Sequence, residues 1–135
     1  MASNRKVGTG FEKDLALALA ACGFWCHNLT QNSQGQPFDV IAARNGVSYP
    51  IDCKVCDRDV FKLERIEENQ FSAMSLWLKT GNDDGWFALR MVNGEVYFLP
   101  FCFMLGCKAV GKRQLNREEI QTNGIRLSEW VKKCS

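Results

Sequence analysis

The chain has 135 residues, of which 46% are hydrophobic and 24% charged, and its formal net charge is +2. These values are typical of one globular domain, so we expect a single domain over residues 1–135. A net charge this small does not by itself indicate nucleic-acid binding, for which local basic clusters are the more suggestive feature.

No stretch approaches the roughly 20 apolar residues that a membrane-spanning helix requires, so we expect no membrane partner. Residues 1–10 are polar and basic and lack the apolar core of a secretory signal, which predicts a cytoplasmic protein. The seven cysteines are an odd, scattered set and are expected to be free thiols. Cys53-x-x-Cys56 has zinc-site spacing but no well-matched second pair, so buried free thiols are the preferred interpretation.

The first predicted helix follows Gly10 and ends at Gly23. Its apolar residues recur at helical spacing, as in Phe11, Leu15, Ala18, Leu19 and Cys22. Glu12 falls in the first turn of this helix, where the helix dipole alone is enough to explain a carboxylate. A short strand is predicted over residues 24–28, and a polar loop over residues 29–36 follows it.

A β-hairpin is predicted from strands at residues 37–44 and 47–55. Asn45-Gly46 lies between them, and this pair favours a two-residue turn because both residues tolerate a positive φ. Counting outward from that turn, Asp39 lies directly opposite Asp52. Like charges at such a pair destabilise a sheet by up to about 1 kcal/mol. The pair therefore requires a compensating cation, for which a divalent metal ion is the obvious candidate.

The same register gives the hairpin two different faces. One face is apolar and includes Phe38 and Cys53, whereas the other collects Asp39, Asp52 and Lys54. Pro50 cannot donate to the ladder and is able to shift the register by one residue. The alternative is an ordinary strand whose scattered charges face solvent.

A second helix is predicted from about Leu63 to Lys79. Gln70 shares its apolar stripe, so its side chain points inward. A buried amide needs partners, so Gln70 either is satisfied within the core or reaches a polar site in the interior. A second hairpin, over residues 86–92 and 95–101, turns at Asn93-Gly94, and a short helix is expected near residues 127–133.

The element order αβββαββ plus a C-terminal helix predicts an α+β fold, with a central mixed sheet that starts from the N-terminal hairpin and is flanked by helices. One apolar cluster is either core or an interface between subunits. Its members are Phe98, Leu99, Phe101, Phe103, Met104 and Leu105.

Two short segments are locally basic. One holds Lys108, Lys112, Arg113 and Arg117 without an acidic residue, and in the other Arg5 and Lys6 precede a predicted turn at Gly8 and Gly10. Such segments either contact phosphates or form solvated loops, and the charge pattern alone does not separate these alternatives.

Pro37-Phe38-Asp39 and Asp52-Cys53-Lys54 resemble the signature of the PD-(D/E)XK nuclease superfamily. Within it the chain is most similar to Holliday junction resolvases of the archaeal and RecU types. The similarity extends over residues 8–92. Its further elements are Gly10-Phe11-Glu12, Gly23-Phe24, a loop with Ser33 and Gly35, and Gln70.

This resemblance implies a restriction-endonuclease-like α/β/α fold and a nuclease that cuts four-way DNA junctions as a homodimer. Glu12, Asp39 and Asp52 would hold Mg²⁺ or Mn²⁺, since carboxylate oxygens suit these ions. Lys54 would position the attacking water or stabilise negative charge, and Gln70 would hold that water or the lysine.

The DNA-binding residues would be Ser33, near the scissile phosphate, with the basic residues of the two clusters. The second acidic position is Asp52, where these resolvases usually have glutamate, and the chain lacks the RecU-type insertion between the acidic motifs. Another nuclease of the superfamily and a non-catalytic DNA-binding module are the alternatives. The presence of all three acids and the lysine speaks against the second of these.

Overall fold

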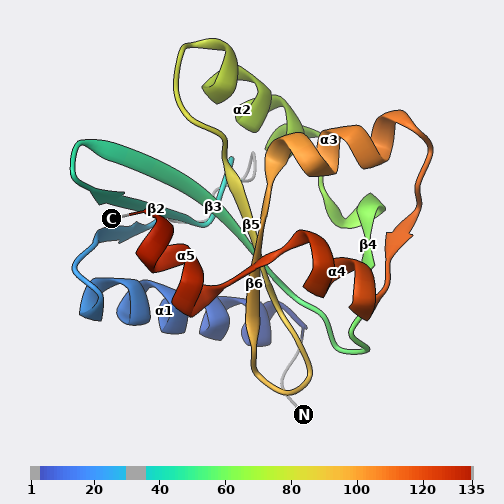
Figure 1. Ribbon diagram of the computed structural model, residues 1–135, viewed down its shortest axis with the longest axis horizontal. Coiled ribbons are helices and arrows are strands. Elements are labelled where there is room, and N and C mark those ends of the chain that lie inside the picture. The colour runs from blue at the N-terminus through green and yellow to red at the C-terminus, as the bar shows by residue number, and fades with distance from the viewer. Residues whose placement is uncertain (1–3, 30–35, 135) are drawn as a thin grey trace.

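The computed structural model describes residues 4–29 and 36–134. In this part of the chain a mixed six-stranded sheet runs in the order β1-β2-β3-β5-β6-β8, and five helices surround it (Figure 1). Only β3 and β5 are parallel neighbours, because the connection between them crosses over through α2. The predicted α+β fold with a central mixed sheet is confirmed.

The elements have the following bounds. The helices are α1 (Asn4–Ala21), α2 (Glu68–Lys79), α3 (Phe101–Ala109), α4 (Arg117–Asn123) and α5 (Leu127–Lys133), with a 3₁₀ turn η1 (Leu63–Arg65). The strands of the main sheet are β1 (Trp25–Asn28), β2 (Val40–Arg44), β3 (Val47–Val55), β5 (Trp86–Arg90), β6 (Val96–Pro100) and β8 (Ile125–Arg126). A separate two-stranded sheet joins β4 (Phe61–Lys62) to β7 (Gln114–Leu115).

Two hydrophobic clusters form the core. The first receives Leu19 from α1 and Trp130 from α5. The second receives Met74 from α2, Phe101 from α3 and Ile120 from α4. Neighbouring residues of β5 and β6 alternate between the clusters, as expected for a sheet that is buried on both faces. Among the described helices, none is long and apolar enough to cross a bilayer.

Helix α1 begins earlier than the sequence predicted. It starts at Asn4 and continues through Gly8 and Gly10, so the predicted turn at these glycines is wrong. Glu12 consequently lies in the middle of the helix and not in its first turn, where the helix dipole would favour it. The dipole therefore does not explain this carboxylate.

The hairpin of β2 and β3 has the predicted turn and register. Asn45 and Gly46 have φ of 55° and 80°, which is why this pair is favoured there. Arg44 pairs with Val47, and the ladder continues without a shift past Pro50. The apolar face of the hairpin packs on a core, as predicted, and from Val40 onward it belongs to the cluster with α1.

The predicted first strand is too long at its N-terminal end. β2 starts at Val40, and Asp39 lies in a bend, with its N–H donating to the carbonyl of Ile51 at 3.0 Å. The ladder therefore stops just before the predicted pair of Asp39 and Asp52. Because alternation fails at this bend, Phe38 packs in the opposite cluster and meets the ring of Trp77 edge-on.

The predicted second helix is divided in two. The turn η1 ends at Arg65, Ile66 is extended, and α2 begins only after Glu67. Glu67 and Gln70 form a capping box, in which each side chain accepts a hydrogen bond from the other residue's backbone N–H. This cap fixes the start of α2, since the first N–H groups of a helix have no partner within it.

Five elements were not predicted from the sequence: β4, and in the C-terminal half β7, β8, α3 and α4. Helix α3 begins directly after Pro100 and contains part of the apolar cluster for which the sequence left core and subunit interface as alternatives. Most of that run is core, because Phe98, Leu99, Phe101 and Met104 are fully buried. The helix predicted near residues 127–133 is α5.

All seven cysteines are free thiols, as predicted. Cys53 and Cys56 are both buried, but Cys53 belongs to the cluster with α1 and Cys56 to the cluster with α2. Their side chains thus enter different parts of the core.

Trp130 fixes α5 to the sheet. Its ring stacks on Phe98 with a centroid distance of 4.2 Å and on Phe24 at 5.6 Å. The guanidinium of Arg44 lies 4.0 Å from the centroid of Phe24 and donates to the carbonyls of Val131 and Cys134 at the end of α5. This helix is therefore part of the core.

We expect Trp130→Ala to lower the free energy of unfolding by about 3–5 kcal/mol, because the side chain is fully buried. The matched control is Trp25→Ala in β1, where 63% of the residue is exposed and the expected loss is below about 1 kcal/mol. Urea unfolding measures both. Equal losses would contradict the packing described for α5.

Candidate active site

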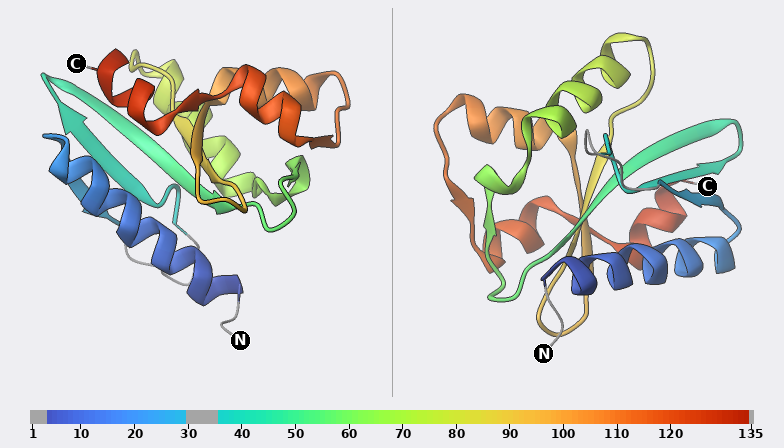
Figure 2. Two further views of the ribbon diagram at one scale, coloured as in Figure 1. Left: turned by 60° about the horizontal axis from the view of Figure 1, so that its bottom comes forward. Right: turned by 180° about the vertical axis from the view of Figure 1, so that it is seen from behind.

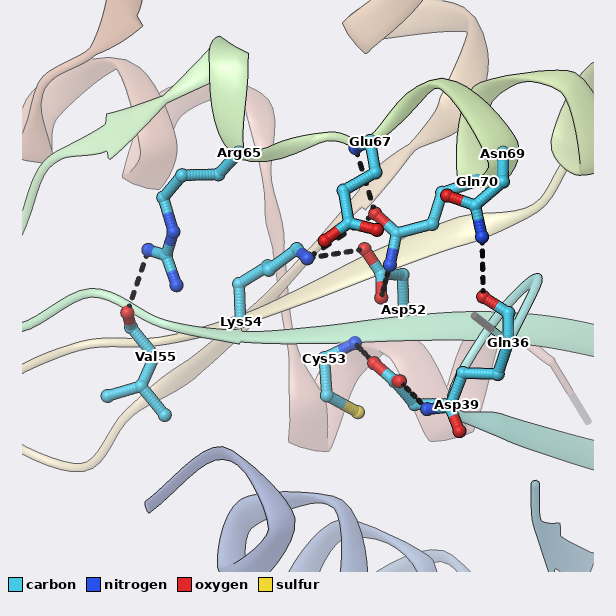
Figure 3. Close-up of polar contacts among 10 residues, drawn as sticks. All are labelled: Gln36, Asp39, Asp52, Cys53, Lys54, Val55, Arg65, Glu67, Asn69 and Gln70. Atoms are coloured by element: carbon cyan, nitrogen blue, oxygen red, sulfur yellow. Dashed lines mark hydrogen bonds and ion pairs between the residues drawn. The ribbon is translucent and has the colours of Figure 1, made fainter. Parts of the chain in front are cut away.

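Asp52 is the most deeply buried carboxylate described in the chain, with 0% exposure. Its Oδ1 accepts a hydrogen bond from Nε2 of Gln70 at 3.2 Å (Figure 3). Its Oδ2 lies 3.4 Å from Nζ of Lys54 and has no hydrogen-bond partner among the described residues. Burial raises the pKa of Asp52 well above its usual range; Lys54 opposes this rise and Asp39 adds to it. A perturbed carboxyl of this kind marks a candidate functional site.

Gln70 joins the polar site, which settles the alternative that the sequence left open. Only 6% of the residue is exposed, so the predicted inward direction is confirmed. Its Oε1 accepts from Nζ of Lys54 at 3.4 Å and from the N–H of Glu67 at 3.1 Å. One amide therefore links Asp52, Lys54 and the start of α2.

Asp39 lies where β2 and β3 separate. Its Oδ2 accepts from the backbone N–H of Cys53 at 2.7 Å, and its Oδ1 accepts from Nε2 of Gln36. Cys53 follows Asp52 directly, so this bond holds the carboxylate of Asp39 against the part of β3 that carries Asp52 and Lys54 (Figure 3). The two carboxylates are close without being partners in the ladder.

Glu12 approaches the same site from α1. Burial, and then contact with Asp39, raise the pKa of Glu12 from 4.5 to about 7, while Lys54 lowers it slightly. Nδ2 of Asn28 donates to the carbonyl of Glu12 at 3.1 Å and ties β1 to this point of the helix. The five residues predicted to be catalytic thus come together from α1, β3, α2 and the bend before β2.

The donor set fits a hard divalent cation. Three carboxyl groups gather here, two of them with raised pKa values, and Oδ2 of Asp52 is buried without a hydrogen-bond donor. Within the described residues, no three His, Cys, Asp or Glu side chains are arranged closely enough to hold a metal ion by themselves. Mg²⁺ commonly uses one or two carboxylates and completes its coordination with water and phosphate oxygens.

Three residues of the site were not predicted. Gln36 is buried, holds Asp39 through its amide, and accepts from Nδ2 of Asn69 through its carbonyl at 3.2 Å. Glu67 caps α2 and donates to Gln70. Gln70 has the spacing of a capping box, but Glu67 is not one of the usual N-cap residues, so the sequence signalled this cap only weakly. The contact of Asn69 with Gln36 spans 33 residues and had no local signal.

Four of the predicted DNA-binding residues lie in described parts of the chain, between the end of α3 and the start of α4. Ser33 lies outside the described residues, and so do the side chains of Arg5 and Lys6 in the first turn of α1. Lys108, Lys112 and Arg113 line one hollow near the end of α3. Arg117 begins α4, and its Nε lies 3.8 Å from a carboxylate oxygen of Asp59.

The sequence matches the family described as archaeal Holliday junction resolvase (Hjc) over residues 3–135. The fold is similar to the 1.6 Å structure of Hjc from Archaeoglobus fulgidus, a Holliday junction resolvase from an archaeal hyperthermophile, with a TM-score of 0.70 and 18% identity. That similarity covers 92% of this chain and 99% of the other. No curated protein sequence matches the chain. The resemblance found in residues 8–92 is confirmed over nearly the whole length.

The raised pKa of Glu12 predicts a pH-dependent stability. The folded state keeps the Glu12 proton between pH 4.5 and about 7, where the unfolded chain releases it, so Glu12 makes folding less favourable as the pH rises through this window. In metal-free buffer at pH 8 we expect Glu12→Gln to be more stable than the wild type by about 1 kcal/mol, since solvent screens a half-buried group. At pH 4 the difference should vanish. Urea unfolding at both pH values measures it, and a gain that is independent of pH would contradict the assignment.

Proposed function

The chain belongs to the archaeal Holliday junction resolvase family, and we propose that it cuts four-way DNA junctions by metal-dependent hydrolysis at the site around Asp52. Membership of this family makes the chain a Holliday junction resolvase, which is an endonuclease of DNA recombination and repair. The observation that carries the proposed mechanism is the buried carboxylate of Asp52, which lies between Lys54 and Gln70 and close to Asp39.

Glu12, Asp39 and Asp52 would hold the metal, with Mg²⁺ or Mn²⁺ favoured by their oxygen ligands. When bound, such an ion activates water and stabilises charge on the phosphate. It also supplies the positive charge that these carboxyl groups need in order to be ionised together at neutral pH. The raised pKa values of Glu12 and Asp52 support this proposal, as does Oδ2 of Asp52, which has no hydrogen-bond donor among the described residues.

Lys54 supplies the cationic group of the site. Its side chain is 14% exposed, so the ammonium is largely shielded from water, and an incoming phosphate would meet it without competition from bulk solvent. As water adds to phosphorus and the P–O bond breaks, negative charge develops on the phosphate oxygens, which a fixed ammonium stabilises. Gln70 holds Nζ in place by accepting from it.

Gln36 and the backbone N–H of Cys53 orient the carboxylate of Asp39. Each of its oxygens accepts one of these hydrogen bonds, so the group cannot turn freely. Each oxygen keeps a second lone pair. Asp39 can therefore act as a ligand while it remains fixed to β3 and to the segment before β2.

The chemistry of the substrate supports a homodimer. Resolution of a junction cuts two phosphodiester bonds that are related by a two-fold axis, and the proposed site uses residues of one chain. Two copies with C₂ symmetry would present one site to each bond. We propose this dimer as the acting form.

Cleavage of matched DNA substrates tests the function. The purified protein with Mg²⁺ is given equal amounts of a four-way junction, a linear duplex, a flap and a single strand. We expect paired, symmetric nicks in the junction and loss of these nicks in Asp52→Asn, which keeps the size of the side chain but removes its charge. Chelation of the metal should also abolish them.

If the linear duplex is cut as well as the junction, the result would contradict selective junction resolution and would indicate a general nuclease. Tight junction binding without metal-dependent cutting of any substrate would instead favour a non-catalytic DNA-binding role. Retention of full activity in Asp52→Asn would overturn the assignment of the site.

Lys54→Ala separates catalysis from binding. Because Lys54 stabilises charge that develops during the reaction, we expect the rate at which the bound junction is cleaved to fall by about 10²–10³-fold, with little change in the Kd for the junction. The control is Lys79→Ala at the exposed end of α2, which should retain both rate and affinity. Single-turnover cleavage and fluorescence anisotropy measure the two quantities. If binding collapses as well, the lysine is a phosphate anchor or a structural residue.

A further inference from the structure

Four basic side chains line one hollow in the surface, which we call the basic hollow. They are Lys62 from β4, Lys108 from the end of α3, and Lys112 and Arg113 from the segment that leads to β7. The hollow has a volume of about 560 Å³, and Glu64 is the one acidic residue in its lining. From the sequence, only Lys108, Lys112 and Arg113 were recognised as a cluster, since Lys62 lies far from them along the chain.

The backbone around the basic hollow is fixed by hydrogen bonds. β4 and β7 lie side by side at one edge of the molecule, and Lys62 pairs with Gln114 (Figures 1 and 2). The N–H of Leu63 donates to the carbonyl of Arg113 at 2.9 Å, and the N–H of Lys112 donates to that of Cys107 at 2.9 Å. The basic side chains therefore project from backbone segments that are held in place by hydrogen bonds.

The charges in the basic hollow are only partly neutralised. Lys112 pairs with Glu119, and Nζ of Lys108 lies 4.5 Å from the centroid of the Phe71 ring. Within the described residues, Lys62 and Arg113 take part in none of the ion pairs, and both are exposed. Several cations held around one hollow attract a ligand that carries repeated negative charges.

The same chain segment connects the basic hollow to the active site. Lys62 and Glu64 line the hollow, and the segment then continues through η1 to the capping box and Gln70. Lys62 and Gln70 are eight positions apart, so even a fully extended chain separates them by at most about 28 Å. One turn of B-DNA is longer, about 34 Å. A single turn of a duplex arm is therefore long enough to span both places.

We propose that the basic hollow binds backbone phosphates of the junction arm that is being cut, within one helical turn of the scissile bond. This inference rests on the proposed function, because it takes its DNA ligand from there. Contacts to phosphates fix the position of a duplex without reading its sequence. The hollow would thus set where along the arm the active site meets the strand.

The test compares two triple variants that lose the same number of positive charges. Lys62→Ala, Lys108→Ala and Arg113→Ala remove three of the four positive charges of the hollow. Lys79→Ala, Lys132→Ala and Lys133→Ala remove three exposed lysines from α2 and α5. Junction binding is measured by fluorescence anisotropy at several salt concentrations, with Ca²⁺ in place of Mg²⁺. Circular dichroism checks that both variants are folded.

We expect the hollow variant to bind the junction at least about tenfold more weakly and to lower the slope of log K against log salt by about 2 to 3, since each phosphate contact contributes about 0.9. The control variant should change neither quantity by as much. Hydroxyl-radical footprinting should show lost protection within one turn of the cut site.

Equal losses in the two variants would overturn the inference, since they would report net charge alone. A hollow variant that fails to fold is replaced by Lys62→Glu, for which the same weakening and lost protection are required. If the wild type binds junctions through the hollow but never cuts them, the proposed function fails and the binding site stands. If it cuts normally and the hollow variant binds as the wild type does, only this inference fails.

Discussion

The full burial of the Asp52 carboxylate is the constraint on which the rest of the site depends. A buried charge is costly unless other groups compensate it, and here one ammonium and one amide do so incompletely. The remaining cost appears in the raised pKa of Asp52 and in its Oδ2 atom, which has no hydrogen-bond donor among the described residues. The divalent cation that we propose for Asp52, Asp39 and Glu12 would remove this cost.

Gln70 both caps α2 and contacts the polar residues of the site, and so links the fold to the proposed chemistry. As the third residue of α2 it closes the capping box with Glu67, and through the same side chain it contacts Asp52 and Lys54. The start of α2 is thus fixed relative to β3. Because α2 is part of the crossover between the parallel strands β3 and β5, the site is held by the centre of the sheet.

Much of the fold could be predicted because local rules and tertiary structure agree. The Asn45-Gly46 turn, the hairpin register, the inward direction of Gln70 and helix α5 all follow from turn chemistry and periodicity. The predictions failed where tertiary packing overrides them. The segment after Pro100 is uniformly apolar, and such a run does not distinguish a buried helix from a strand.

The sequence by itself determined the candidates for the chemistry, since two acids and a lysine on one face of a hairpin follow from its turn and its period of two. It also determined the family that these motifs resemble. Only the tertiary structure decided that Asp39 leaves the ladder to accept from Cys53, that Glu12 reaches the site from the middle of α1, and that Gln36 and Asn69 join it. The physical reason is that these contacts join separate segments, and their geometry is set by packing and by the need to satisfy buried polar groups, which no local pattern encodes.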